Sequence, residues 1–431
     1  MVGFLLVILF LIFLILSVPV SFAMLLTCFV YIIFTQNVAS TFVPLGLISG
    51  SSSMLVLAAP FFILMGELMN ITGVTKRIFQ FADTVVGHFP GGLGQVNVIA
   101  SLIFSGISGS AVADAAGLGI IEIKAMKDAG YDAEFSAGIT AASSIIGPIF
   151  PPSYSFVLFG IFAGVSIGSL FLGGAIVGII MALSLMVAVY VISRNKNYPK
   201  HQPESLKNIW NSFKETFWAL LTPVILIGGI LHGQTTPTEA SAIAVLYSLI
   251  LGLFIYKEVT LKKLLEVLRN SIPKIGMCLL LIGSGTVFGW MLGTEKIADF
   301  LGNYLLQFQS KIIAILIINI FLLFIGTFMS SEAALIVSIP ILMPVILKLG
   351  IHPVTFGVAM VLNISIGLLT PPTALVIFVT SKIAEISFDK VFKAVIPYYV
   401  PLLIVIALIY IFPGLTLWLP SLFFGQLTLS P

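Results

Sequence analysis

Apolar runs long enough to cross a lipid bilayer recur along almost the whole of this 431-residue chain. A transmembrane helix needs about 20 predominantly apolar residues. Only 9% of the residues are charged, whereas an ordinary soluble domain has about 25%. The sequence therefore predicts an all-α polytopic membrane protein, and no stretch has the composition of a separate soluble domain.

Polar or Gly/Pro breaks divide the apolar sequence into ten predicted crossings, two of them interrupted. They lie near residues 2–17, 20–34, 54–72, 135–166, 169–192, 216–231, 237–256, 273–292, 353–386 and 395–412. Two further apolar regions, 92–124 and 312–347, each carry small polar residues halfway along. Because each half is short for a spanning helix, we expect two re-entrant helical hairpins that enter and leave on the same side.

The distribution of basic residues sets the expected orientation. Residues 1–75 contain no Lys or Arg, which favours a retained first helix with an outside N-terminus. The crossings then place 17 of the 20 basic residues inside, among them Lys200, and leave Lys296, Lys311 and Lys348 outside. This asymmetry follows the positive-inside rule.

Composition also argues against several functional classes. A formal net charge of +3 without a Lys/Arg-rich run gives no footprint for nucleic acid. Cys28 and Cys278 fall within apolar segments and the histidines are scattered, so we expect neither a disulfide nor a transition-metal site. No nucleophile–base pair and no Gly-x-x-x-x-Gly-Lys-Ser/Thr loop appears, so we expect no enzyme, no ATPase and no organic cofactor.

The segment GPIFPPSYSF at 147–156 breaks a predicted crossing with three prolines. A broken helix survives at membrane depth only where protein buries it or where it lines a cavity, because hydrocarbon offers no partner for free backbone groups. A shift of 220 positions aligns this segment with GLLTPPTALV at 367–376 without a gap. The same shift aligns both hairpins through the pairs Gly106/Gly326, Ser110/Ser330, Phe104/Phe324 and Gly130/Gly350.

In the predicted topology the first broken helix runs from inside to outside and the second runs the opposite way. The chain is thus predicted to contain an inverted-topology repeat, which is typical of secondary transporters with sites built from discontinuous helices. Freed carbonyls could ligate a monovalent cation, and half-helix N-termini favour an anionic group. A simple kink or hinge is the alternative interpretation of the prolines.

The predicted hairpin tips are SGISGSAVAD at 105–114 and GTFMSSEAA at 326–334. Their small residues allow close backbone approach. Asp114 follows where a second half-helix would begin, so it either neutralises that helix's dipole or has a functional role, the default for an intramembrane acid. Glu332 is the acid of the second tip, and it aligns with Val112 rather than with Asp114.

Three other segments have structural interpretations. Thr236-Pro237-Thr238-Glu239 has the pattern of a capping box, which favours a structural role for Glu239, although contact with a partner is an alternative. The amphipathic cationic segments 75–89 and 261–274 are predicted interfacial helices on the inner face.

These elements divide the chain into five predicted parts. Residues 1–75 form N-terminal scaffold helices, and 76–192 form the first repeat with its interfacial helix. Residues 193–275 form an inner-face loop, scaffold helices and an interfacial helix. Residues 276–412 form the second repeat, and 413–431 form a tail.

Five segments together resemble the large membrane subunit of the tripartite ATP-independent periplasmic (TRAP) transporters, over nearly the whole chain. They are GELMNITGVTKRI, SGISGSAVADAAGLG, IGPIFPPSYSFVLFG, TTPTEASAIAVLY and GLLTPPTALVIF. The resemblance implies a sodium-coupled elevator importer of organic acids in the bacterial inner membrane, with a periplasmic N-terminus. It also implies two partners, a small four-helix membrane subunit and a periplasmic substrate-binding protein.

The resemblance also implies sodium sites where the hairpin tips meet the broken helices. The sodium candidates are Ser108, Gly109, Ser110, Asp114, Gly147, Pro148 and Pro151 for one site and Gly326, Thr327, Met329, Gly367 and Thr370 for the other. The substrate candidates are Ser108, Pro152, Ser153, Ser330, Ser331, Pro372 and Thr373.

Overall similarity favours sialic acid as the substrate over a C4-dicarboxylate. No Arg lies at a hairpin tip or a broken helix to form a carboxylate clamp. A stand-alone dicarboxylate/sodium symporter with similar hairpins is an alternative. An ion channel is a weaker one, because the few charges lie mainly in loops.

Overall fold

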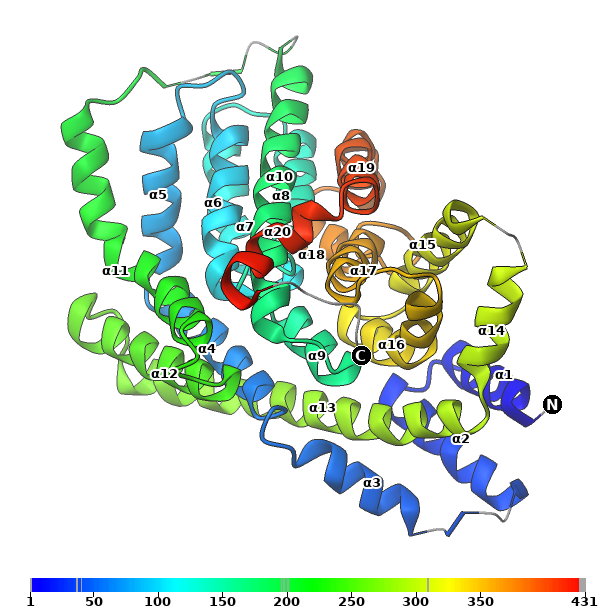
Figure 1. Cartoon of the computed structure of the whole chain (residues 1–431). Coiled ribbons are helices and arrows are strands. Elements are labelled where there is room, and N and C mark those ends of the chain that lie inside the picture. The colour runs from blue at the N-terminus through cyan, green and yellow to red at the C-terminus, as the bar shows by residue number, and fades with distance from the viewer. Residues whose placement is uncertain are drawn as a thin grey trace.

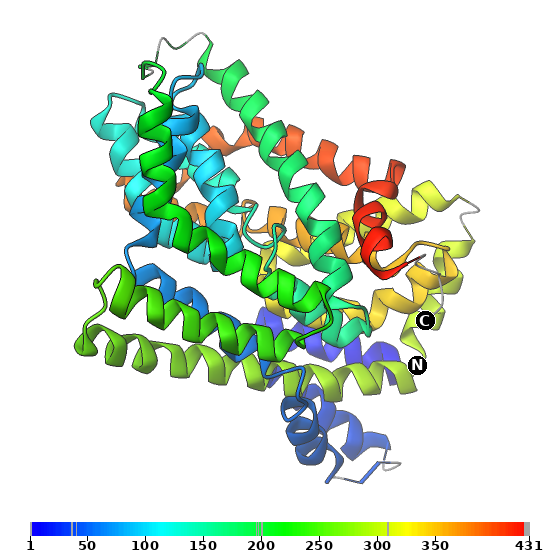
Figure 2. The same ribbon diagram turned by 60° about the vertical axis from the view of Figure 1, so that its left-hand side comes forward.

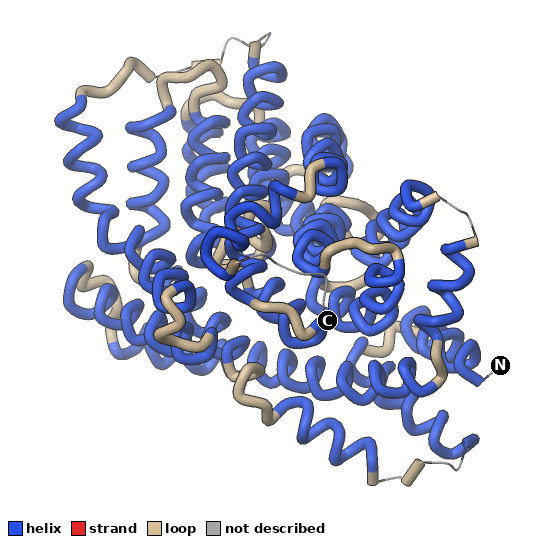
Figure 3. The backbone as a smooth tube through the Cα atoms, in the orientation of Figure 1, coloured by secondary structure: helices blue, strands red, loops and turns tan. Residues whose placement is uncertain are grey.

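The computed structural model of the chain describes residues 2–35, 38–39, 41–194, 196, 198–199, 201–307 and 310–425. Lys200, which the topology places inside, and residues 426–431 of the predicted tail lie outside these ranges. Within the described residues all regular structure is helical, as Figure 3 shows. The all-α fold class is confirmed.

The N-terminal part contains four helices. They are α1 (Val2–Ile15), α2 (Val20–Thr35), α3 (Phe42–Ser51) and α4 (Ala58–Ile71). Three of them match predicted crossings, whereas α3 was not predicted. Helix α3 packs along the long helix α13 (Leu261–Thr294), and Figures 1 and 2 both show α13 along one side of the molecule. Such tertiary packing stabilises a helix that its local sequence does not specify.

Helix α13 also corrects the boundary between the predicted interfacial helix at 261–274 and the crossing at 273–292. The two are one continuous helix of 34 residues with Pro273 inside it. A proline removes one helical hydrogen bond and kinks or breaks a helix that nothing else supports. Here α13 packs against α2, α3, α4 and α16 along its length, and these contacts hold it continuous.

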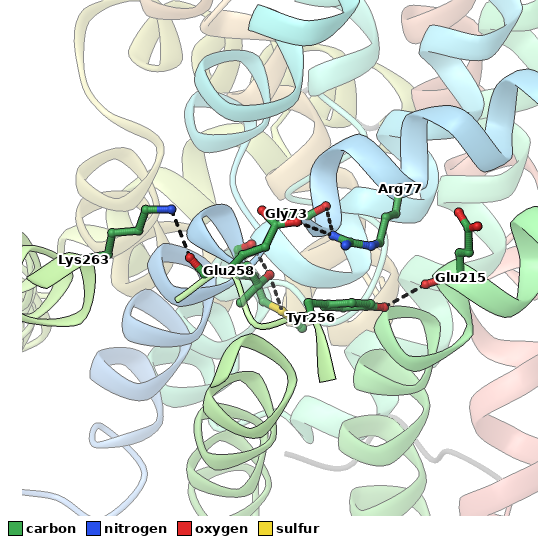
Figure 4. Close-up of polar contacts among 8 residues, drawn as sticks. Gly73, Arg77, Glu215, Tyr256, Glu258 and Lys263 are labelled. Atoms are coloured by element: carbon green, nitrogen blue, oxygen red, sulfur yellow. Dashed lines mark hydrogen bonds and ion pairs between the residues drawn. The ribbon is translucent and has the colours of Figure 1, made fainter. Parts of the chain in front are cut away.

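The predicted amphipathic segment 75–89 is helix α5 (Val74–Val86), which is bent by 71° from α4. Gly73 forms the elbow with φ of +72°, a conformation that glycine adopts without a steric penalty. Arg77 donates to the Gly73 carbonyl at 2.9 Å and to Glu258 at 3.0 Å, and its guanidinium lies 4.1 Å from the centre of the Tyr256 ring (Figure 4). The same figure shows Lys263 donating to the Glu258 carbonyl, so the elbow is tied to the start of α13.

The two repeats have the predicted order of elements. The first contains α6 (Leu93–Ser108), α7 (Ala111–Asp128), α8 (Ala133–Ser144) and α9 (Tyr154–Ala163). The second contains α15 (Lys311–Phe328), α16 (Ser331–Lys348), α17 (Pro353–Gly367) and α18 (Leu375–Ala384). Each repeat is a helical hairpin followed by a broken helix, and the Pro-Pro peptide bond of each break is cis. The repeats interlock, because α16 packs on α9 while α18 packs on α7 and α8.

The expectation that each hairpin half is short for a span is wrong for the second hairpin. Helices α15 and α16 have 18 residues each, and both are long and apolar enough to cross a membrane. The re-entrant character rests instead on packing, because each tip contacts a break midway along a predicted crossing. In all, seven described helices are long and apolar enough to span, or eight if α4 and α5 form one bent span.

The remaining helices connect or flank the repeats. They are α10 (Ile167–Ser193), α11 (Leu206–Leu231), α12 (Pro237–Ile250) with a π-helical turn (Leu251–Ile255), α14 (Ile297–Leu306), α19 (Phe388–Ile411) and α20 (Gly414–Phe424). The predicted capping box of α12 is present, since the Glu239 carboxylate accepts from Thr236 N at 2.8 Å and the Thr236 hydroxyl accepts from Glu239 N at 3.3 Å. The predicted capping box is therefore confirmed, whereas contact of Glu239 with a partner stays a prediction.

Long-range polar contacts join residues that the topology places on the same side. The inner-face pairs are Arg77–Glu258, Lys196–Asp132 and Lys390–Glu134. The outer-face pairs are Lys348–Asp299, Lys311–Gly350 O and Tyr31–Glu295. Lys196, together with the Tyr198 hydroxyl, holds the pKa of the Asp132 carboxyl below its usual range. The packing is thus consistent with the predicted order of crossings.

We predict opposite labelling of two exposed positions, Gln234 and Lys207. In a chain whose Cys28 and Cys278 are replaced by Ser, a membrane-impermeant maleimide should label Gln234→Cys in intact spheroplasts. Lys207→Cys should react only after the membrane is permeabilised, because positive-inside topology puts it in the cytoplasm. Labelling of Lys207→Cys in intact spheroplasts would contradict the orientation.

Candidate functional site

A hairpin tip meets a broken helix at two places, which we name the first and second hairpin crossings to distinguish them from the membrane crossings. The first hairpin crossing joins the tip between α6 and α7 to the break between α8 and α9. Gly109 ends α6 with φ of +60°, and a Cβ there would lie 3.0 Å from the Pro152 carbonyl oxygen. A Cβ on Gly147 would lie 3.1 Å from the Ser110 carbonyl carbon and oxygen. Tip and break therefore meet backbone to backbone, and a side chain on either glycine would press on the facing backbone.

The second crossing is closer still. A Cβ on Gly367 would lie 2.4 Å from the Gly326 carbonyl carbon, and one on Gly326 would lie 2.7 Å from the Ile364 carbonyl oxygen. Thr373 donates its N–H and its hydroxyl to the Thr327 carbonyl at 3.2 and 2.6 Å. These bonds fasten the α15–α16 tip to the break between α17 and α18.

The sodium candidates therefore gather at two crossings. Residues of the first set lie at the first tip and break, and Gly326, Thr327, Met329, Gly367 and Thr370 lie at the second. The Thr370 hydroxyl already makes a hydrogen bond with the Tyr399 hydroxyl of α19, at 2.9 Å. The Ser108 hydroxyl, by contrast, is buried and has no hydrogen-bond partner among the described residues.

A small pocket lies between the two crossings. Its walls come from both repeats and consist of Ser110, Ala111, Val112, Pro148, Ser155, Ser330, Ser331, Glu332, Leu368 and Leu375. Four half-helices begin at these walls, namely α7, α9, α16 and α18. A helix N-terminus carries about half a positive elementary charge and unpaired N–H groups, so the pocket is suited to an anion.

The pocket includes only part of the predicted substrate set. Ser330 and Ser331 line it, whereas Ser108, Pro152, Ser153, Pro372 and Thr373 do not. Ser153 is turned into its own break, where its hydroxyl donates to the Pro148 carbonyl and accepts from Phe156 N at 3.3 Å. Sequence reasoning missed Ser155, although the start of a half-helix after each break was a usable signal.

The two tip acids have different surroundings. Asp114 lies in the first turn of α7 and is 1% exposed, and neither of its carboxyl oxygens has a hydrogen-bond partner among the described residues. It therefore makes no capping hydrogen bond. Glu332 lies in the first turn of α16 and lines the pocket beside Val112, the residue with which the 220-residue shift aligns it.

A membrane protein with two inverted hairpin and broken-helix units around one central pocket has the architecture of a secondary transporter. Comparison with known proteins specifies this class further. The chain belongs to the tripartite ATP-independent periplasmic transporters as their large permease, because the family model of the DctM component matches residues 7–415.

Three proteins with similar sequences are named as permeases of TRAP transporters. The chain is 44% identical over 410 residues to the sialic acid TRAP transporter large permease protein SiaM of Vibrio cholerae, covering 95% of this chain and 96% of that protein. It is 41% identical to the sialic acid TRAP transporter permease protein SiaT of Haemophilus influenzae, covering 94% of this chain and 66% of that protein. It is 36% identical to the C4-dicarboxylate TRAP transporter large permease protein DctM of Pseudomonas aeruginosa, covering 85% and 86%.

Among solved structures, the fold is similar to that of the YdaH transporter of Alcanivorax borkumensis, whose topology is described as unusual. The TM-score is 0.63 over 91% of this chain and 89% of that chain. The sequence identity is 15%, so this likeness concerns the fold alone.

We predict that Gly367→Ala reduces substrate uptake at least about tenfold, because its methyl group would overlap the Gly326 backbone and force the second crossing apart. Gly276→Ala in α13 is the matched control, since a Cβ there meets nothing within 4 Å. Uptake by proteoliposomes measures both. Equal uptake by the two variants would contradict the close packing of Gly367 against the Gly326 backbone.

Proposed function

We propose that this chain is the transport subunit of a sodium-coupled importer that carries an organic acid across the bacterial inner membrane. The observation that supports it best is the convergence of four half-helix N-termini on one pocket between two hairpin crossings. In each repeat the first half-helices end at the crossing, with their carbonyl groups towards it, and the second half-helices begin there. Carbonyl ends suit Na⁺, and N-terminal ends suit a carboxylate.

Sodium has a second role in this proposal. None of the residues that line the pocket is basic, and Glu332 adds a negative charge. A carboxylate substrate therefore needs positive charge from helix N-termini and from ions bound at the adjacent crossings. Binding of substrate and of sodium would then favour each other, which is the requirement for coupled transport.

The pocket hydroxyls bear on the substrate. Ser110, Ser155, Ser330 and Ser331 offer donors and acceptors that suit a hydroxylated acid better than a plain dicarboxylate. This chemistry, together with the names of the relatives from Vibrio cholerae and Haemophilus influenzae, favours sialic acid as the substrate. A C4-dicarboxylate is the second candidate, named for the relative from Pseudomonas aeruginosa.

An elevator movement fits the way the helices pack. The two repeats interlock through α16 with α9 and through α18 with α7 and α8, so they could move as one body. Helices α2, α3 and α4 pack against α13 and would form the scaffold. We propose that the N-terminus is periplasmic, that a small four-helix membrane subunit covers the scaffold, and that a periplasmic binding protein delivers the substrate.

We predict that uptake of sialic acid by the reconstituted complex with its binding protein disappears when Na⁺ is replaced by K⁺. Asp114→Asn should raise the sodium concentration for half-maximal uptake by about tenfold or more, because it removes the carboxylate whose charge Na⁺ at the first crossing would balance. Asp128→Asn is the matched control, since Asp128 is exposed at the other end of α7.

Uptake that is indifferent to sodium would contradict the proposal. Sodium-driven uptake by this chain alone, with neither partner present, would instead indicate a stand-alone symporter.

A further inference from the structure

Helix α7 carries a second buried acid, Glu122, eight residues after Asp114. Both side chains are 1% exposed. None of their four carboxyl oxygens has a hydrogen-bond partner among the described residues, and neither acid takes part in an ion pair within that part of the chain. Eight residues of helix span about 12 Å, so Glu122 lies well away from the tip and the first crossing.

An ionised carboxylate is very costly to bury without a cation, and such a group takes up a proton instead. Close packing around Glu122 favours the proton over a bound metal ion. Gly119, one turn earlier on α7, lies so close to α8 that a Cβ there would be 2.9 Å from the Thr140 methyl group.

A chain of hydrogen bonds between α6 and α8 runs beside both acids. Asn97 donates to the Thr140 hydroxyl at 2.7 Å, Ser143 donates to the Asn97 side-chain carbonyl at 2.6 Å, and Ser101 donates to Ser143 at 3.1 Å. Thr140, at one end of this chain, packs on α7 at Gly119, one turn from Glu122. Ser101 lies beside Asp114 at the other end.

The second repeat has a similar side-chain hydrogen bond between its helices but no acid at the positions aligned with Asp114 and Glu122. Asn363 donates to the Asn319 side chain at 2.6 Å and so joins α17 to α15, as Ser143 and Thr140 join α8 to α6. Asn363 is the residue that the 220-residue shift aligns with Ser143. The same shift aligns Asp114 with Ala334 and Glu122 with Leu342, so the buried acids belong to the first repeat alone.

We propose that Glu122 keeps a bound proton and, as a neutral acid, is a positioning residue for the first sodium site. In its protonated form the carboxyl group would bond Thr140, extend the Thr140–Asn97–Ser143–Ser101 chain to α7, and so hold α7, with Asp114, against α6 and α8. The Thr140 hydroxyl accepts one hydrogen bond, from Asn97, so its second lone pair can accept the Glu122 proton. This inference rests on the proposed sodium coupling.

Replacement of Glu122 by Gln and by Leu tests whether the Glu122 carboxyl group acts as a neutral acid or as a charged carboxylate. Gln keeps the size and the uncharged hydrogen-bonding groups, so Glu122→Gln should leave the half-maximal sodium concentration of uptake within about twofold of the wild type. Glu122→Leu leaves Thr140 without a partner on α7, and it should raise that concentration by about tenfold. The maximal rate at saturating sodium should change less than the sodium concentration does, because the pocket itself is intact.

Two further variants accompany this pair in the reconstituted complex. Thr140→Val removes the other end of the contact, and it should shift sodium dependence in the same direction as Glu122→Leu even if that variant folds poorly. Glu134→Gln is the control, because Glu134 is a partly exposed acid on α8 that pairs with Lys390. This variant should leave the sodium concentration for half-maximal uptake unchanged.

The outcomes distinguish the two proposals. Wild-type uptake that ignores sodium overturns the proposed function and this inference with it. With sodium-dependent wild-type uptake, a Glu122→Gln variant as impaired as Glu122→Leu overturns the inference alone, because the charge would then be essential. Unchanged sodium dependence in both Glu122→Leu and Thr140→Val also overturns it.

Discussion

The structure depends on the requirement that no backbone polar group is left unpaired in hydrocarbon. Two broken helices violate this requirement unless other protein covers them, and the tips of two hairpins provide the cover. Contact is close enough that Gly147 and Gly367 cannot carry a side chain without displacing the facing backbone. The hairpins, the breaks and the inverted repeat are therefore one arrangement, because neither a hairpin nor a break is stable at that depth without the other.

The same arrangement separates charge. Every hairpin and broken helix contributes one half-helix that ends near the centre and one that begins there, so carbonyl groups collect at the crossings and N–H groups collect around the pocket. Opposite partial charges are thus presented side by side without basic side chains. In the first repeat Asp114 places a buried carboxyl group near its crossing, whereas the second repeat has Ala334 at the aligned position.

Much of this arrangement follows from the sequence. Apolar length, the two Gly-x-x-x-Pro-Pro segments and their shared register predict the crossings, the breaks and the repeat, because these are local properties of the chain. Sequence could not predict that α3 is a helix or that α13 continues through Pro273, since both depend on packing between distant segments. Nor could it predict that Ser155 lines the pocket while Ser153 turns away, because that depends on rotation about the start of α9.

In the proposed function each hairpin crossing would bind one sodium ion. Equilibrium binding of radioactive sodium to the purified wild-type complex tests it most directly, because it needs neither substrate nor transport. We expect two saturable sodium sites per chain and the loss of one site when Gly147 is replaced by Ala. Absence of saturable sodium binding, or an unchanged number of sites in that variant, would contradict it.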